Sequence, residues 1–200
     1  GYLKSATDMA PYISLKDLAS TRIQLPPLPT LVAIAEVLGA LDDKIAVNAR
    51  VAAAAVRLAD SEYQSARSQS SLVESTFDAV CSASGGGTPS TKVPEFWDGD
   101  IPWVTPTDVT ALSSPYLDRT SRQITEAGLA KCSSALYPVE SILMTSRATI
   151  GAFALAKTPV AVNQGFIVAH SRNQAAQLWL FHEMRSRVED FLAHANGATF

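Results

Sequence analysis

Apolar residues between positions 30 and 70 recur at alternating steps of three and four, which is the heptad pattern of a coiled coil. The seam consists of Leu31, Ile34, Leu38, Leu41, Ile45, Asn48, Ala52, Ala55 and Ala59. We predict one helix over 30–70, N-capped by Thr30 and roughly 60 Å long at ~1.5 Å per residue. Because one small domain would not cover such a rod, we expect a partner helix; a long core helix is the alternative.

Residues 1–29 have the pattern of the end of a preceding unit. Segment 11–18 predicts a short strand or turn followed by a helical turn. Pro26, Pro27 and Pro29 then hold the chain extended, because proline fixes φ and restricts the residue before it. We therefore predict a stiff, proline-rich entry into the long helix.

Residues 71–200 differ in composition, because glycine, proline, serine and threonine separate short apolar runs. Such runs predict strands over 141–146, 149–156, 160–162 and 165–170. A short helix is predicted over 121–132. A longer amphipathic helix is predicted over 173–197, capped by Asn173, with Leu178, Phe181, Val188 and Leu192 on one face. The predicted fold class is α+β, a mixed α/β domain attached to a long coiled-coil-forming α-helix.

The composition is that of a globular chain, with 200 residues, 47% hydrophobic and a formal net charge of −3. This charge excludes a strongly basic wrapper of nucleic acid, but it leaves room for a local surface that reads DNA. No apolar run is long enough to span a bilayer, so we expect no membrane partner. Two cysteines that lie 51 positions apart make a disulfide framework improbable and indicate a cytoplasmic protein.

The usual catalytic motifs are missing from this sequence. The glycine run 85–87 is not a phosphate-binding P-loop, because Lys92 is out of register. Asp98 and Asp100 lack the lysine spacing of a metal-dependent nuclease, and Asp98-Gly99 predicts a turn instead. No nucleophile motif is present, and three histidines twelve positions apart do not suggest a metal site. We therefore predict no catalytic residue, no metal and no cofactor in this chain.

Several polar residues in predicted turns suit contacts with nucleic acid. Arg147 lies between two predicted strands among hydroxyl side chains, which suits contacts with phosphate or guanine. The alternative is a structural arginine bonded to backbone carbonyls. Asn163 and Gln164 offer amides that pair with an adenine edge, although they could equally cap a turn. The two tryptophans of 97–103 would fix a loop that holds polar groups toward a groove.

These segments together resemble the specificity subunits of type I restriction–modification systems. The motifs that match are Pro11–Leu18, Ile23–Pro29, Ala33–Leu38, Leu41–Ile45, Gly86–Ser90, Trp97–Trp103, Ser146–Gly151 and Asn163–Phe166. The resemblance implies three parts. They are the end of a preceding recognition domain with its proline-rich entry (1–29), a spacer helix (30–70), and a target recognition domain truncated at its C-terminus (71–200).

The resemblance implies a non-catalytic DNA reader that recognises one half of a bipartite target. The implied partners are double-stranded DNA, methyltransferase subunits, a restriction–translocation subunit, and a second spacer helix from a missing half or another copy. S-adenosylmethionine, ATP and Mg²⁺ would belong to the partner subunits.

The candidate DNA-binding residues are Gly86, Thr88, Ser90, Lys92, Trp103, Thr105, Thr145, Ser146, Arg147, Asn163 and Gln164. The candidate pairing residues of the helix are Leu31, Ile34, Leu38, Leu41, Ile45 and Asn48. Two competing hypotheses are a coiled-coil scaffold whose α+β domain binds a ligand other than DNA, and a metal nuclease that uses Asp98 and Asp100.

Overall fold

The structure is a computed structural model that describes residues 12–195. The chain forms two compact units, residues 1–46 and 47–200, with the boundary inside helix α2 (Leu28–Gln69). In the first unit, helix α1 (Leu15–Ser20) begins at Ser14, whose side chain accepts a hydrogen bond of 3.1 Å from the Asp17 amide. For residues 1–11, the prediction that they belong to the end of a preceding recognition domain concerns residues outside the described part of the chain.

Helix α2 agrees with the predicted helix except at its start. It begins at Leu28, and Thr30 is not its cap, because the Thr30 amide already donates to the Pro27 carbonyl at 2.9 Å. The prolines end the extended entry and form the first turn, where a missing N–H costs nothing. Tyr63 is the only buried residue of α2, so the alternative of a long core helix is wrong. No helix of residues 12–195 is both long and apolar enough to cross a membrane.

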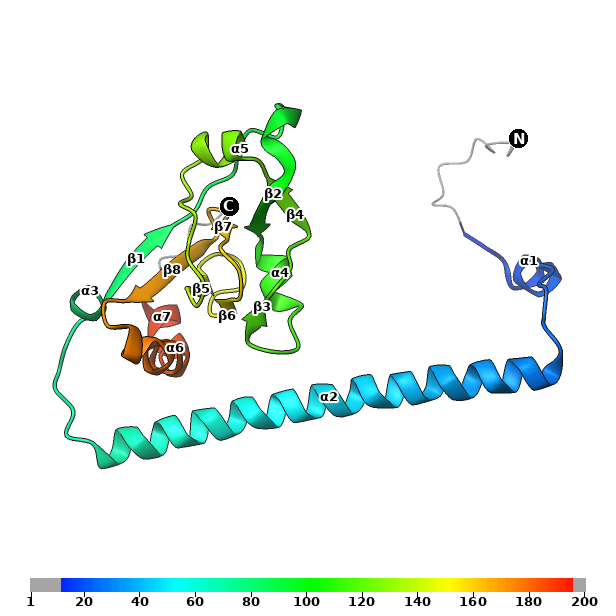
Figure 1. Cartoon of the computed structure of the whole chain (residues 1–200), viewed down its shortest axis with the longest axis horizontal. Helices are drawn as coiled ribbons and strands as arrows, with labels where there is room; N and C mark the ends of the chain where they lie inside the picture. The colour runs from blue at the N-terminus through cyan, green and yellow to red at the C-terminus, as the bar shows by residue number, and fades with distance from the viewer. Residues whose placement is uncertain (1–11, 196–200) are drawn as a thin grey trace. The chain divides into compact units, whose positions relative to one another are not determined.

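The second unit contains two sheets that pack on each other (Figure 1). The larger sheet has the strand order β1 (Cys81–Gly85), β8 (Phe166–Ser171), β5 (Ile142–Thr145), β6 (Phe153–Ala156) and β3 (Tyr116–Leu117). The smaller has the order β4 (Arg122–Ile124), β2 (Trp97–Val104) and β7 (Ala161–Val162). Pairing is antiparallel except for β3 with β6 and β2 with β7.

Short helices connect and cover these strands. They are α3 (Phe77–Val80), α4 (Pro106–Thr110), α5 (Glu126–Ala130), α6 (Gln177–Ser186) and α7 (Val188–His194), with 3₁₀ turns η1 (Pro94–Phe96) and η2 (Gln174–Ala176). Strand and helix are thus mixed beside one long helix, which confirms the predicted fold class.

Alternation along β5 explains how the layers form, because successive strand residues point to opposite faces. Ile142 and Met144 face α6, where they pack with Leu180, Phe181 and Met184. Leu143 lies in the opposite core, packed with residues of α4, β7 and β8. The larger sheet is therefore covered by α6 on one face and by the smaller sheet with α4 on the other.

Three predicted elements differ from the observed ones. The predicted helix over 121–132 is strand β4 followed by α5, because residues 122–124 pair with β2. The predicted helix over 173–197 begins as η2, capped by Asn173, and breaks at Arg187 into α6 and α7. Its predicted apolar face is also wrong in part, because Leu178 and Leu192 are exposed. The predicted turn at Asp98-Gly99 is an irregularity within β2, and Asp98 has a φ of 58°.

Candidate nucleic-acid interface

Three of the predicted polar segments meet at one edge of the larger sheet. The register pairs Gly85, the last residue of β1, with Ile167 near the start of β8. It also pairs Thr145, the last residue of β5, with Phe166. The Ser146 amide then donates to the Gly165 carbonyl at 2.8 Å. The glycine run, the Asn163–Gly165 turn and the Arg147 turn are therefore neighbours, and we call this edge the loop edge.

The glycine run passes directly over the end of β7. The Gly87 amide donates to the Val162 carbonyl at 2.9 Å, and the Trp103 indole N–H donates to the Gly87 carbonyl at 3.0 Å. A Cβ at Gly86 would lie 2.1 Å from the Val162 oxygen, so only glycine fits there. The run is thus a fixed segment of backbone rather than a loose loop.

The Arg147 turn is held from inside by a single hydroxyl. Thr145 is fully buried; its hydroxyl donates to the Thr149 carbonyl and accepts from the Ala152 amide at 2.9 Å. The Gly151 amide donates to the Thr145 carbonyl at 3.0 Å, and Ala148 has a φ of 58°, a left-handed conformation that costs free energy for a residue other than glycine. This strained, tethered turn presents Arg147 at its tip.

Arg147 itself is exposed, and its guanidinium makes no hydrogen bond or ion pair with residues 12–195. The alternative of a structural arginine bonded to backbone carbonyls finds no support in this part of the chain. The five donors of the guanidinium are therefore available to a ligand at the loop edge.

The amide side chains of the Asn163–Gly165 turn have different roles. Asn163 Oδ1 accepts from the Gly165 amide at 2.8 Å, so its oxygen caps the turn. Gln164 is exposed and accepts a hydrogen bond from the Thr88 hydroxyl, which ties the glycine run to the turn. Gln164 thus lies at the surface between two of the three segments.

The eleven residues predicted to contact DNA differ in how exposed they are. Exposed side chains belong to Thr88, Ser90, Lys92, Arg147 and Gln164, whereas Gly86, Thr105, Ser146 and Asn163 are half-buried. Trp103 and Thr145 are buried, and their side chains hold the loops from inside, so a direct contact of these two side chains with DNA stays a prediction.

Thr105 also has a structural partner. Its amide and hydroxyl both donate to Asp108 Oδ2, at 2.8 and 2.6 Å, and the Ser121 amide donates to Asp108 Oδ1 at 2.8 Å. Burial raises the pKa of Asp108, but these donors from Thr105 and Ser121 outweigh it, and the pKa lies below its ordinary value. The ionised carboxylate thus fixes the start of α4 beside the loop edge.

Sequence reasoning missed residues whose partners are far away along the chain. The Arg122 guanidinium carbon lies 3.6 Å from the centre of the Trp97 ring, because β4 pairs with β2. Asp60 and Tyr63 of α2 contact α6, more than a hundred positions later. Tyr63 is the one aromatic residue of α2, and that isolation was the available signal. Within residues 12–195, no group of three or more His, Cys, Asp or Glu side chains could hold a metal ion.

Comparison with known proteins identifies the family. The type I restriction modification DNA specificity domain matches residues 71–200. The chain belongs to this family. This finding does not favour the scaffold hypothesis with a ligand other than DNA.

Two curated relatives are type I restriction enzyme specificity subunits. The chain is 39% identical over 116 residues to the MjaIX specificity subunit of Methanocaldococcus jannaschii, a match that covers 58% of this chain and 27% of the relative. It is 33% identical over 116 residues to the EcoR124I/EcoR124II specificity subunit of Escherichia coli, covering 56% of this chain and 28% of the relative. The matches thus span little more than a quarter of each relative.

The fold is similar to that of a solved S subunit. A type I restriction–modification S subunit from M. genitalium superposes with a TM-score of 0.55 at 14% identity, over 81% of this chain and 42% of that chain. This likeness supports the shared architecture of the two proteins.

Proposed function

We propose that this chain is the non-catalytic DNA reader of a type I restriction–modification complex and recognises one half of a bipartite target. The observation that supports this most is the loop edge, where Arg147, Gln164 and the glycine run are held together on the family's specificity domain. An arginine fork and an amide on a rigid backbone are suited to base edges and phosphates. Residues 71–200 contain nine Lys and Arg against twelve Asp and Glu, so we expect partner subunits to supply most phosphate contacts.

The partners follow from the family and from the exposed helix seam. Ile34, Leu38, Leu41 and Ile45 are 46–66% exposed. A row of such residues on one helix face is stabilised when a second helix covers it. We propose that a second spacer helix, from another copy or from a further part of a longer chain, pairs along Leu31–Asn48.

Methyltransferase and restriction–translocation subunits would assemble on the paired helices and the DNA. In this proposal S-adenosylmethionine, ATP and Mg²⁺ serve those subunits, and this chain binds none of them. Bond-making and bond-breaking would therefore take place on the partners.

The test is target methylation by the complex after an Arg147→Ala substitution. Loss of one good bidentate contact should weaken recognition by about 1–3 kcal/mol. The methylation rate of a target duplex, at a limiting concentration of the complex, should therefore fall by about 5–150-fold. The matched control is Lys157→Ala, which removes one exposed positive charge beyond the end of β6, away from the Arg147 turn. The target duplex is chosen from the methylated sites mapped in the source cell. If complexes with Arg147→Ala and with Lys157→Ala methylate this duplex equally, the proposed reading surface is refuted.

A further inference from the structure

One aromatic residue of α2 is buried against the recognition domain. Tyr63 is 6% exposed and is the only buried residue of the 42 in α2. Its ring lies 4.7 Å from that of Trp179 and 5.8 Å from that of His182, measured between centroids. Both partners belong to α6, so the Tyr63 side chain packs on this helix.

The hydroxyl of Tyr63 lies next to a group of charged side chains. It donates a hydrogen bond to Glu183, which also pairs with Arg187 and lies 3.7 Å from Arg67 of α2. Burial raises the pKa of Glu183, but the Tyr63 hydroxyl and Arg187 outweigh it and keep the pKa below its ordinary value. Glu183 is therefore an ionised acceptor, held from α2 and from the end of α6.

A second carboxylate lies on α2 and is contacted by side chains of α6. Asp60 Oδ1 accepts a hydrogen bond of 2.7 Å from Arg185 Nη1 and lies 2.7 Å from His182 Nδ1. Asp60 and Tyr63 are three positions apart, so they lie on the same face of α2. About one turn of α2 is thus joined to about one turn of α6 by reciprocal polar contacts.

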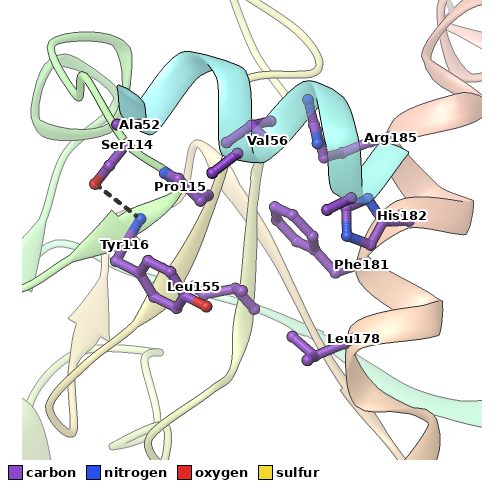
Figure 2. A pocket seen from close by; sticks show the side chains of 12 residues that line it. Ala52, Val56, Ser114, Pro115, Tyr116, Leu155, Leu178, Phe181, His182 and Arg185 are labelled. Atoms are coloured by element: carbon purple, nitrogen blue, oxygen red, sulfur yellow. Dashed lines mark hydrogen bonds between the residues drawn. The ribbon is translucent and has the colours of Figure 1, made fainter. Parts of the chain in front are cut away.

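Apolar packing between α2 and the domain is incomplete around these polar contacts. A cavity of about 320 Å³ lies between α2, α6 and β3, lined by Ala52, Val56, Pro115, Tyr116 and Phe181 among others (Figure 2). A second cavity of about 300 Å³ lies on the other side, against Gly151 and Val188. Along these two open pockets α2 does not pack closely on the domain, so dispersion contacts are fewer there than in a filled core.

The covalent connection does not fix the angle between α2 and the domain. Residues 70–76 form no helix or strand and are exposed, so the segment that joins α2 to α3 is a plain linker. The polar contacts that join α2 directly to α6 are those of Tyr63 and Asp60, with Arg67 beside Glu183.

We propose that Asp60 and Tyr63, with Glu183 and Arg185, form an orienting clamp that determines which spacing between half-sites the complex accepts. This inference rests on the proposed function. The four residues are positioning residues: they touch no base, but they set the direction in which the loop edge points from the helix. A helix separates two recognition domains by a defined distance only when each domain is held at a defined angle.

The experiment compares the wild-type complex with an Asp60→Asn/Tyr63→Phe variant, which weakens the polar contacts and keeps the ring and the side-chain volumes. The matched control is Glu62→Gln, because Glu62 is an exposed carboxylate in the same turn of α2 with no ion pair to residues 12–195. Methylation is measured on duplexes that carry the mapped half-sites at their natural spacing or at spacings one and two base pairs shorter or longer.

We expect the double variant to lose preference for the natural spacing over its nearest neighbours by about tenfold, equivalent to about 1.4 kcal/mol. Its preference among half-site bases should equal that of the wild type, and the control should match the wild type in both respects. If the double variant folds poorly by tryptophan fluorescence, the single Tyr63→Phe variant, which lacks one hydroxyl, is scored on the same duplexes.

An unchanged spacing preference in a folded variant would overturn the clamp, as would loss of base preference to the same extent as spacing preference. Failure of the proposed function gives a different result, because the wild-type complex would then show no sequence preference at any spacing.

Discussion

Thr145→Val tests whether the Arg147 turn is held from inside by one hydroxyl. Valine has nearly the shape of threonine, so the substitution leaves the buried volume almost unchanged, and its effect comes from the lost hydroxyl. The Ala152 amide then loses an acceptor at 2.9 Å, and the Thr149 carbonyl loses its donor. The turn keeps its two backbone bonds, from the Gly151 amide to the Thr145 carbonyl and from the Thr145 amide to the Ala152 carbonyl, but loses both bonds of the hydroxyl.

The expected size follows from burial. Thr145 is 0% exposed and a valine methyl takes the place of its hydroxyl, so the Ala152 amide loses its partner on the buried side, and an unsatisfied buried group costs about 1–3 kcal/mol. For a chain of this length, 1 kcal/mol shifts Tm by about 2–4 °C, so Tm should fall by about 2–12 °C. Target methylation should fall by no more than it does in Arg147→Ala, because the hydroxyl acts only through the turn.

Thermal unfolding followed by tryptophan fluorescence gives the first quantity, since Trp97 and Trp103 are buried in this domain. Methylation of a target duplex by the complex gives the second. Thr158→Val is the control, because Thr158 is exposed beyond the opposite end of β6 and undergoes the same chemical change.

Either of two results would refute the reasoning. A Tm equal to that of the control would mean that the hydroxyl does not stabilise the turn. A lowered Tm with wild-type methylation would mean that the geometry of the turn is irrelevant to recognition.

Two further predictions concern acid stability and helix pairing. Because hydrogen bonds hold the pKa of Asp108 below its unfolded value, they stabilise the fold above the ordinary carboxyl pKa of about 3.9, and this stability is lost as the pH falls through the folded pKa. Asp108→Asn should lower the free energy of unfolding at pH 7, and urea titrations should show the difference from wild type narrowing below about pH 4; a constant difference would contradict this. Leu38→Glu places a charge in the exposed seam of α2, so sedimentation velocity should show weaker self-association than in wild type; identical profiles would argue against pairing of two copies through this face.

Local patterns predicted the elements whose side chains repeat in a regular way. The strands β5, β6, β7 and β8 fall within predicted strands or overlap them closely, because short apolar runs bounded by turn residues are a local signal. The segment 122–124 was predicted wrongly as helix, since its strand conformation depends on pairing with β2 twenty positions earlier. Helix propensity is a weak signal where tertiary pairing competes with it.

The recognition motifs were predicted as a set, but their individual roles were not. Thr145 and Arg147 are two positions apart in one motif, yet one is fully buried and the other is exposed. A residue type and its neighbours indicate what a side chain can bond, whereas its actual partner depends on which strands are adjacent. The same holds for Thr105, whose hydroxyl is bonded to Asp108.

The sequence by itself determined the long helix with its apolar seam, the α+β character of residues 71–200 and the resemblance to specificity subunits. These properties depend on periodicity and on motifs of a few residues, which are visible along the chain. Only the tertiary structure decided which polar residues reach the loop edge and how α2 is joined to α6. Those outcomes depend on contacts such as Tyr63 with Glu183, 120 positions apart, and no local pattern encodes a partner at that distance.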